Sequence, residues 1–431
     1  MGNRISQFHV DKLGRYAEIF PGFAFKSERF TDDPADVALV KGENVQQGFI
    51  DWSESKYWPI VDADSFSKFE LRVGDIVLAM DRPWVTAGLK WAHIKRHDPT
   101  ALLVQRVSRL RAKNGLNQTY LRCVISSRYF SDYIQPIVTG VNVPHISGKQ
   151  ISDVKIPLPP PLIQQKIAAI PSAYDELIDN NQRRIALLEK MAEEIYREWF
   201  VRLRFPGYEK VKFVKGVPEG WKLVRLENAF KFTGGGTPTK DVTRYWDSGD
   251  VNWFTPSDIT GADGIFLERS GEQCTEVGFN NSSAKMFPAN SVMLTSRATI
   301  GAVGINLTPA CTNQGFITCI PNARYPLPYL YHWIKLAKPH FELLSGGATF
   351  AELTKRTFKR IEIMTPPEPI VTEFARIESP LFEAIENHLR ANRKLTETRD
   401  KLLPRLISGK LSVEDLAIQF PPSMKEPAHE T

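Results

Sequence analysis

Two stretches of the chain carry apolar residues in the alternating four-and-three spacing of a coiled-coil seam. One seam runs from Tyr174 to Trp199 and the other from Leu381 to Leu406, each with polar interruptions. Residues spaced in this way form a single stripe along a helix. We therefore predict two long helices with these packing residues: Ile178, Asn181, Ile185, Leu188, Ile195, Trp199, Ile385, Asn392, Leu395, Leu402 and Leu406.

Because the two seams match, we expect the helices to pack on each other. A single amphipathic helix would more simply face a globular core, and that alternative stays open for each stretch. Asn181 and Asn392 would fix the register of the pair at some loss of stability. Ser172 and Ser379 are expected as N-caps, and a helix from about 172 to 200 would be roughly 40 Å long.

The regions before the helices contain short apolar runs separated by glycine and proline. The runs at 76–80, 101–107 and 292–295 have the length and composition of strands. Proline clusters at 157–161 and 365–369 then end each β-rich region. The pattern predicts domains at 1–160 and 207–367, helical segments at 161–206 and 368–418, and a tail at 419–431.

The two β-rich regions repeat one another. Residues 151–164 align with 358–371 at an offset of 207, which continues without a gap into the helices. Upstream, 74–82 aligns with 289–297 at an offset of 215, which pairs Arg82 with Arg297. An offset that is constant in one region and drifts in another predicts a duplicated frame with different loops.

Charge follows the same division. The 55 Lys and Arg against 49 Asp and Glu give a net charge of only +6. Residues 1–160 and 206–367 carry +4 each, whereas 161–205 carry 0 and 368–431 carry −2. Any nucleic acid would therefore contact the β-rich domains.

Composition narrows the class of protein. No apolar run reaches the ~18 residues that a membrane-spanning helix needs, so we expect no membrane span. Four scattered cysteines without a C-x-x-C pair predict reduced, buried thiols in a cytoplasmic protein. The usual phosphate-loop, metal-binding and nucleophile motifs are missing, so we predict no catalytic residue and no metal site.

Three features occur at similar places in both copies and suit DNA recognition. They are a strand ending in an arginine, a glutamine at a strand edge, and a polar loop before the proline cluster. Arginine pairs with guanine or phosphate and glutamine with adenine, although a surface ion pair or a polar strand edge is equally simple. The first copy contributes the candidates Arg82, Trp84, Gln105, Arg109, Arg111, Asn142, His145 and Lys149. The second contributes Thr237, Lys240, Ser257, Ser296, Arg297, Thr299, Gln314, Thr349, Lys355 and Arg356.

Four segments carry a further signal: GWKLVRLENAFKFTGGGTPTKDVTRYWDSGDVNWFTPSDI (220–259), LTSRATIGAVGI (294–305), NQGFI (313–317) and DKLLPRLISGKLSV (400–413). Together with the proline-to-helix boundaries, they resemble the specificity subunits of type I restriction–modification systems. The resemblance covers essentially the whole chain, including the duplicated layout. The first copy departs most, with MDRPWVTAG where the second has TSRATIG.

The resemblance implies a mixed α/β fold in which two target-recognition domains are held apart by two long antiparallel helices. Each domain would read one half of a split, asymmetric site on double-stranded DNA. Two methyltransferase subunits would dock on the helices and supply S-adenosylmethionine for adenine methylation. Restriction subunits would add cleavage driven by ATP and magnesium, so this chain itself would hold no cofactor.

Two other classes of function stay open at this stage. A self-contained DNA methyltransferase or nuclease with an unrecognised site would bind S-adenosylmethionine or cut DNA alone. A helical scaffold that binds proteins would show no salt-sensitive DNA binding.

Overall fold

The computed structural model describes residues 8–53, 55–85, 88–138, 144–262, 264–346 and 351–424. Two compact units account for the chain. The first comprises Met1–Asp179 with Arg393–Thr431, and the second comprises Asn180–Asn392.

The first unit contains several small β-sheets. Its main sheet has the order β2-β10-β5-β8 and is antiparallel, and a second sheet, β4-β3-β9, contains the parallel pair β3 and β9. β1 and β11 form a separate antiparallel pair. The strand bounds are β1 His9–Lys12, β2 Ala17–Pro21, β3 Val37–Val40, β4 Tyr57–Trp58, β5 Ile76–Ala79, β6 Trp84–Val85, β7 Gly88–Leu89, β8 Trp91–His93, β9 Ala101–Leu103, β10 Val107–Ala112 and β11 Lys155–Leu158.

Helices bury the main sheet of the first unit. Tyr120 and Phe130, from α3 and α4, pack with strand residues Ile76 and Leu110 in one apolar core. Side chains of Asn117 and Ser127 cap α3 and α4 by accepting from backbone N–H groups. The short helices of this unit are α1 Leu13–Tyr16, α2 Ile60–Ala63, α3 Gln118–Ser126, α4 Arg128–Ile134 and α5 Gly148–Asp153.

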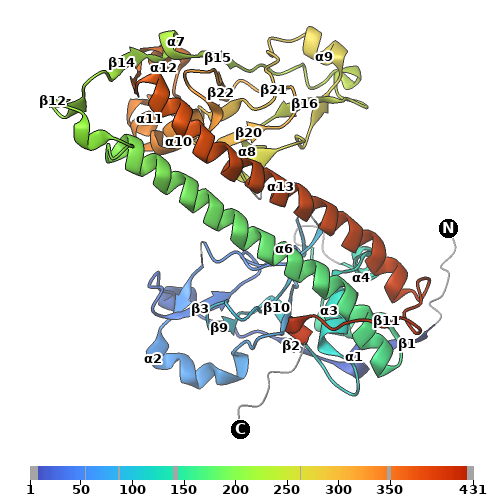
Figure 1. Ribbon diagram of the computed structural model, residues 1–431. Helices are drawn as coiled ribbons and strands as arrows, with labels where there is room; N and C mark the ends of the chain where they lie inside the picture. The colour runs from blue at the N-terminus through green and yellow to red at the C-terminus, as the bar shows by residue number, and fades with distance from the viewer. Residues whose placement is uncertain are drawn as a thin grey trace. The chain divides into compact units, whose positions relative to one another are not determined.

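The second unit repeats this plan. Its main sheet is β15-β22-β19-β20-β17, its second sheet is β18-β16-β21 with β16 and β21 parallel, and β14 pairs with β23. The strand bounds are β12 Phe213–Val214, β13 Val217–Pro218, β14 Lys222–Arg225, β15 Lys231–Gly234, β16 Val251–Phe254, β17 Phe266–Leu267, β18 Gln273–Cys274, β19 Val292–Thr295, β20 Val303–Asn306, β21 Ala310–Thr312, β22 Phe316–Ile320 and β23 Glu362–Thr365. The short helices are α7 Leu226–Ala229, α8 Pro256–Thr260, α9 Glu276–Asn280, α10 Leu327–Leu336, α11 Lys338–Leu344 and α12 Lys355–Arg360 (Figure 1).

Strand registers confirm the duplication. Asp11 opposes Ile156 in the first unit, and Val224 opposes Ile363 in the second, at offsets of 213 and 207. The pairs Ile19–Leu110 and Phe232–Cys319 repeat the relation in the main sheets. Both copies also contain one parallel pair in the smaller sheet, so topology and register are both conserved between the two halves.

The registers correct one alignment. Leu78 opposes Ser108 and Leu294 opposes Ile317, so the offset between β5 and β19 is 216. Arg82 therefore corresponds to Ala298, and the counterpart of Arg297 is Asp81. The predicted pairing of Arg82 with Arg297 was wrong by one residue, because it matched identical letters while the hydrogen-bonded ladder sets the register.

Two long helices complete the fold. α6 spans Pro161–Tyr196 and α13 spans Glu368–Ile407, with 36 and 40 residues. At 1.5 Å per residue they are about 54 and 60 Å long, more than the roughly 40 Å expected. Ser172 and Ser379 are not N-caps, because both lie inside the helices. The Ser172 hydroxyl instead donates to the backbone oxygen of Ala168 (2.7 Å).

The predicted seams are packing surfaces. In the second unit Ile185 of α6 and Trp199, in the π-helical turn Arg197–Val201 that follows α6, share a core with Ile385 of α13. Asn181 Nδ2 donates to Asn392 Oδ1 at 2.8 Å. In the first unit Ile163 and Ile167 of α6 share a core with Leu406 of α13. Figure 1 shows the two helices side by side. In each unit the seam residues also pack on the globular part, so both alternatives for the seams are correct: the helices pack on each other and on a globular core.

The compact units cut across the predicted linear domains. α6 and α13 begin at Pro161 and Glu368, where the predicted helical segments begin, but each helix contributes one end to each unit. α13 ends at Ile407, so the segment predicted to reach 418 is helical only in part. The four cysteines are free and buried. Within the described residues, no helix has the length and apolarity needed to cross a membrane.

Candidate functional site

In the second unit, four loops meet at one end of three neighbouring strands. The loops are 235–237 after β15, 296–299 after β19, 313–315 before β22 and 351–355 before α12, and we call them the second loop edge. Backbone hydrogen bonds join them: Ser296 N donates to Gly315 O (2.8 Å), and Leu353 N donates to Ser296 O (2.8 Å). Gly236 N donates to Thr312 O (2.9 Å). The loops therefore form one hydrogen-bonded surface.

Glycines allow this close approach. A Cβ atom on Gly235 would lie 1.9 Å from the backbone oxygen of Asn313, a distance that no real side chain tolerates. A Cβ on Gly234 would lie 2.0 Å from Nζ of Lys355, so the lysine side chain lies directly over the glycine. The Gly-Gly-Gly run is thus a backbone contact between β15 and its neighbours.

Polar side chains are exposed along the second loop edge. Thr237 Oγ1 donates to Gln314 Oε1 at 2.6 Å, so the predicted Thr237 and Gln314 are brought together. Arg297, Thr299, Lys355 and Arg356 are also exposed. Ser257 is exposed on α8, whose Pro256 lies close to Gly315.

The first unit contains the equivalent surface. The loops 22–23, 80–82, 105–106 and 144–147 form the first loop edge. Met80 N donates to Arg106 O and Ile146 N donates to Met80 O, both at 2.8 Å. Arg82 N donates to Pro144 O (2.7 Å), just as Ala298 N donates to Ala351 O (3.2 Å). The same backbone frame therefore carries different side chains in the two copies.

Charges along the first loop edge are partly paired. Asp81 binds the His145 ring and lies 3.4 Å from the Arg106 guanidinium. At the equivalent place a backbone bridge joins Arg297 to Glu352. Gln105, Arg82 and Lys149 are exposed, and His145 is half-buried.

The backbone is strained where these loops meet. Arg82 and its counterpart Ala298 both have positive φ angles, +43° and +61°. Left-handed backbone is costly for residues with a side chain and is often found at functional sites.

Five predicted contact residues already contact other parts of the protein: four are buried or half-buried, and Lys240 does so at the surface. Arg109 is 4% exposed and pairs with Glu18 at 3.2 Å, and Arg111 pairs with the buried Asp75. Trp84 is half-buried against the core of the first unit, and Ser296 is 3% exposed. Lys240 binds Glu272 (2.7 Å) and lies over the rings of Trp246 and Trp253. These side chains hold the fold, which the alternation of charges alone did not reveal.

Two further predictions cannot be placed, because Asn142 and Thr349 lie outside the described residues. Phe23 and Arg106 of the first loop edge were missed as candidate site residues. The sequence does contain a signal for Phe23: LGRYAEIFPG (13–22) aligns with LENAFKFTGG (226–235) at an offset of 213, and the next position pairs Phe23 with Gly236.

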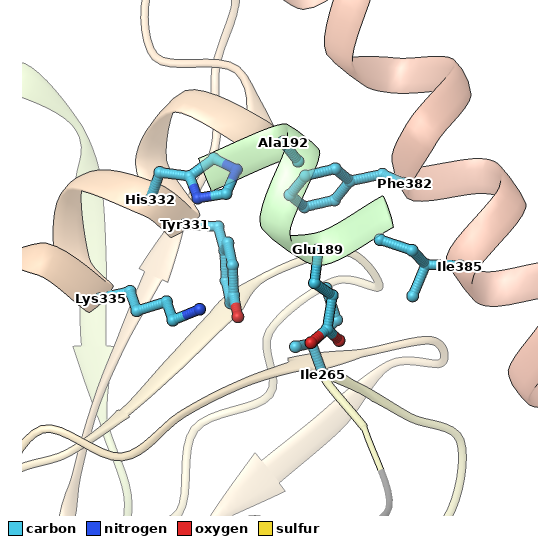
Figure 2. A pocket seen from close by; sticks show the side chains of 8 residues that line it. All are labelled: Glu189, Ala192, Ile265, Tyr331, His332, Lys335, Phe382 and Ile385. Carbon is cyan, nitrogen blue, oxygen red and sulfur yellow. The ribbon is translucent and has the colours of Figure 1, made fainter. Parts of the chain in front are cut away.

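A second feature of the second unit is a pocket between α6, α10 and α13 (Figure 2). It is lined by Glu189, Ala192, Ile265, Tyr331, His332, Lys335, Phe382 and Ile385. Its volume open to water is about 0 Å³, so it is a packing junction and has no room for a ligand. Lys335 Nζ forms an ion pair with Glu193 at 2.9 Å beside it.

One lining residue, His332, belongs to a buried pair of titratable groups. His332 Nε2 and Glu378 Oε2 are 3.5 Å apart, too far for a good hydrogen bond, and both side chains are almost fully buried. Burial lowers the pKa of His332 to about 3 and raises the pKa of Glu378 to about 8, so both groups are neutral near pH 7. Among the described residues, no group of three or more His, Cys, Asp or Glu side chains is arranged to hold a metal ion.

Comparison with known proteins gives a consistent result. A sequence model of the family described as "Type I restriction modification DNA specificity domain" matches residues 36–190 and 218–396. The two matched segments correspond to the two copies and together exceed half of the chain.

Individual proteins similar to this chain are also specificity subunits of type I systems. The chain is 27% identical over 315 residues to the type I restriction enzyme MjaIX specificity subunit of Methanocaldococcus jannaschii, covering 70% of this chain and 71% of the relative. It is 24% identical over 393 residues to the putative MjaX specificity subunit of the same organism, covering 89% of each. The crystal structure of the S subunit of a type I restriction-modification system from M. genitalium has the same fold, with a TM-score of 0.56 at 15% identity, covering 94% of this chain and 97% of that one.

Proposed function

Since the chain belongs to the family of type I restriction modification DNA specificity domains, we propose that it is the DNA-recognising subunit of a type I restriction–modification complex. Each compact unit reads one half of a bipartite, asymmetric target on double-stranded DNA. The observation that carries this proposal is the pair of loop edges. They share one hydrogen-bonded frame but carry unlike exposed side chains, as two readers of different half-sites require.

The proposed DNA contacts are polar residues of the loop edges and of the adjoining helices α5, α8 and α12, all exposed except the half-buried His145 and Thr237. In the first unit they are Arg82, Gln105, Arg106, His145 and Lys149. In the second unit they are Thr237, Ser257, Arg297, Thr299, Gln314, Lys355 and Arg356. Arginine and glutamine side chains of this kind pair with base edges in the major groove, and lysines bind phosphates.

Partner subunits supply the chemistry in this proposal. Two methyltransferase subunits, with S-adenosylmethionine, methylate adenine, and restriction subunits cleave with ATP and magnesium. This chain then contributes recognition alone and binds no cofactor.

The methyltransferase subunits dock on the long helices. Leu187 and Met191 of α6 are 61% and 53% exposed and lie one turn apart, an apolar patch that suits a partner helix. Replacing both with Glu should abolish co-purification of the methyltransferase subunit. The matched control is Leu223→Glu, which alters a leucine of similar exposure (59%) on β14 and should leave assembly intact.

Methylation mapping tests the proposal as a whole. The chain is expressed with its cognate methyltransferase subunit in cells that lack other adenine methylation, and methylated adenines are located by sequencing. We expect one split motif with a fixed spacer. Methylation that is absent, or independent of this chain, would contradict the proposed function.

A further inference from the structure

The first loop edge carries an exposed aromatic ring where the second has glycine. Phe23 N donates to Leu103 O (3.0 Å), and Gln105 N donates to Phe23 O (2.7 Å). In the second unit the hydrogen bond equivalent to that between Phe23 N and Leu103 O is made by Gly236, whose N donates to Thr312 O (2.9 Å). Phe23 thus occupies the position of Gly236 and is tied directly to the proposed DNA contact Gln105.

The ring of Phe23 packs against three other phenylalanine rings. Its centroid lies 5.0 Å from the rings of Phe25 and Phe66 and 5.2 Å from the ring of Phe69. The residue nevertheless remains 38% exposed. A Cβ on the preceding Gly22 would lie 2.2 Å from Val104 O, so the backbone is seated tightly as well. A ring fixed in this way presents apolar surface with little loss of freedom on binding.

The surroundings of Phe23 are polar and cationic. Gln105 and Arg106 are exposed next to it on the same loop edge. An apolar group among hydrogen-bonding groups matches the major-groove edge of an A·T pair, where the thymine methyl lies beside hydrogen-bonding atoms of the base pair. Phenylalanine is one of the side chains that can make apolar contact with that methyl group.

We infer that Phe23 reads the C5-methyl group of a thymine in the half-site recognised by the first unit. This inference rests on the proposed function and adds a specificity-determining residue to it. The second unit, with Gly236 at this position, makes no such contact. The two half-sites are therefore read by different chemistry at equivalent places.

Deoxyuridine substitution tests the inference, because it removes only the methyl group. In the complex with its methyltransferase subunits, each thymine of the mapped target is replaced singly and the Kd is measured by competition. We expect one position in one half-site to cost about fourfold in affinity, the value of one buried methyl group. In the Phe23→Ala complex that same substitution should cost nothing further.

Two other variants complete the design. Phe49→Ala removes an exposed ring (55%) of the same unit that lies off the loop edge, and it should keep the deoxyuridine penalty. Phe23→Leu preserves apolar surface at this position and should therefore keep part of the deoxyuridine penalty. This variant distinguishes loss of the methyl contact from misfolding.

The results that overturn the inference are specific. A deoxyuridine penalty that persists in Phe23→Ala, or a first half-site without any A·T pair, would exclude a methyl contact by Phe23. Loss of complex assembly in Phe23→Ala and Phe23→Leu alike would make Phe23 part of a protein interface. Failure of the proposed function looks different, because the wild-type complex would then show no split sequence preference.

Discussion

At the scale of single residues, the exposed cations of the loop edges differ in how they are held. Arg106 is paired with Asp81, whereas within the described residues no carboxylate pairs with Arg297. Arg109 and Arg111 are bound to Glu18 and Asp75. An arginine already paired inside the protein has a lower gain from binding a base or a phosphate. Removal of Arg297 should therefore weaken DNA binding directly, without first releasing a carboxylate of the protein.

Arg297→Ala should weaken binding of the specific target by ~1–3 kcal/mol and relax discrimination in one half-site, because a bidentate contact to a base is lost. The measurement is a competition titration of the complex with target, single-substitution and random DNA. Arg269→Ala is the matched control, since Arg269 is exposed in the same unit but binds Gln273 away from the loop edge. An equal loss on random DNA would reassign Arg297 to a phosphate contact.

At the scale of elements, the long helices combine apolar packing with a few polar contacts that set their register. Asn181 and Asn392 bond to each other across the seam, and Arg399 bonds to Asp175 at 2.7 Å in the first unit. Polar pairs in a seam cost stability compared with leucine but disfavour shifted registers. α13 also carries Glu378, which is buried against His332 without a good hydrogen bond.

Replacing Asn181 and Asn392 together with Leu should raise the melting temperature by several degrees, because apolar packing replaces a partly buried amide pair. The single change Asn392→Ala should instead lower stability by about 1 kcal/mol, since the Asn181 amide loses its partner. Calorimetry of the three proteins checks both signs. Asn181→Ala and the double Ala variant complete a double-mutant cycle with Asn392→Ala, and additive effects in that cycle would show that the two amides do not interact.

Glu378→Gln should flatten the dependence of stability on pH above about pH 4.5. The folded-state pKa of about 8 exceeds the ordinary value of 4.5, so the stability contributed by the protonated carboxyl is full below pH 4.5 and is lost as the pH rises through 8. The loss is of the order of a few kcal/mol. Denaturant unfolding at pH 5, 6.5 and 8 measures it, with Glu383→Gln on the exposed face of α13 as control. A wild-type protein that is no less stable at pH 8 than at pH 5 would refute the assignment.

At the scale of the whole molecule, each long helix contributes one end to each compact unit. α6 passes from the first unit into the second, and α13 returns from the second to the first. If each unit reads one half-site, the length of these helices sets the spacer between the half-sites. The recognised sequence then has two independent parts: the bases that the loop edges read, and a distance that the helices impose.

Removing one heptad from both α6 and α13 should shorten the preferred spacer by about three base pairs, because seven residues of helix span about 10 Å. Methylation mapping with the shortened chain measures the spacer directly. The half-site sequences should stay the same, and they serve as the internal control. An unchanged spacer would mean that the helices do not determine it.

Much of this protein could be predicted from the sequence alone. The duplication, the two long helices, the seam residues and the Asn181–Asn392 pair follow from periodicity and internal alignment, since these patterns depend on neighbours along the chain. The same alignment placed Gln105 and Gln314 at equivalent positions, which the registers support: each follows the last paired residue of β9 or β21 by two positions.

Only the tertiary structure decided which side chains are free to contact DNA and which positions correspond between the two copies. Arg109 and Arg111 look like surface cations in the sequence, but they are withdrawn from the surface and bound by Glu18 and Asp75, which lie far away along the chain. Lys240 is a surface cation, but it is bound by the distant Glu272. The shift that pairs Asp81 with Arg297 is set by hydrogen bonds between strands, and so is the position of Phe23 beside Gln105. Local pattern determines the elements because it acts through adjacent residues, whereas exposure, pairing and register depend on contacts that exist only after the strands have assembled.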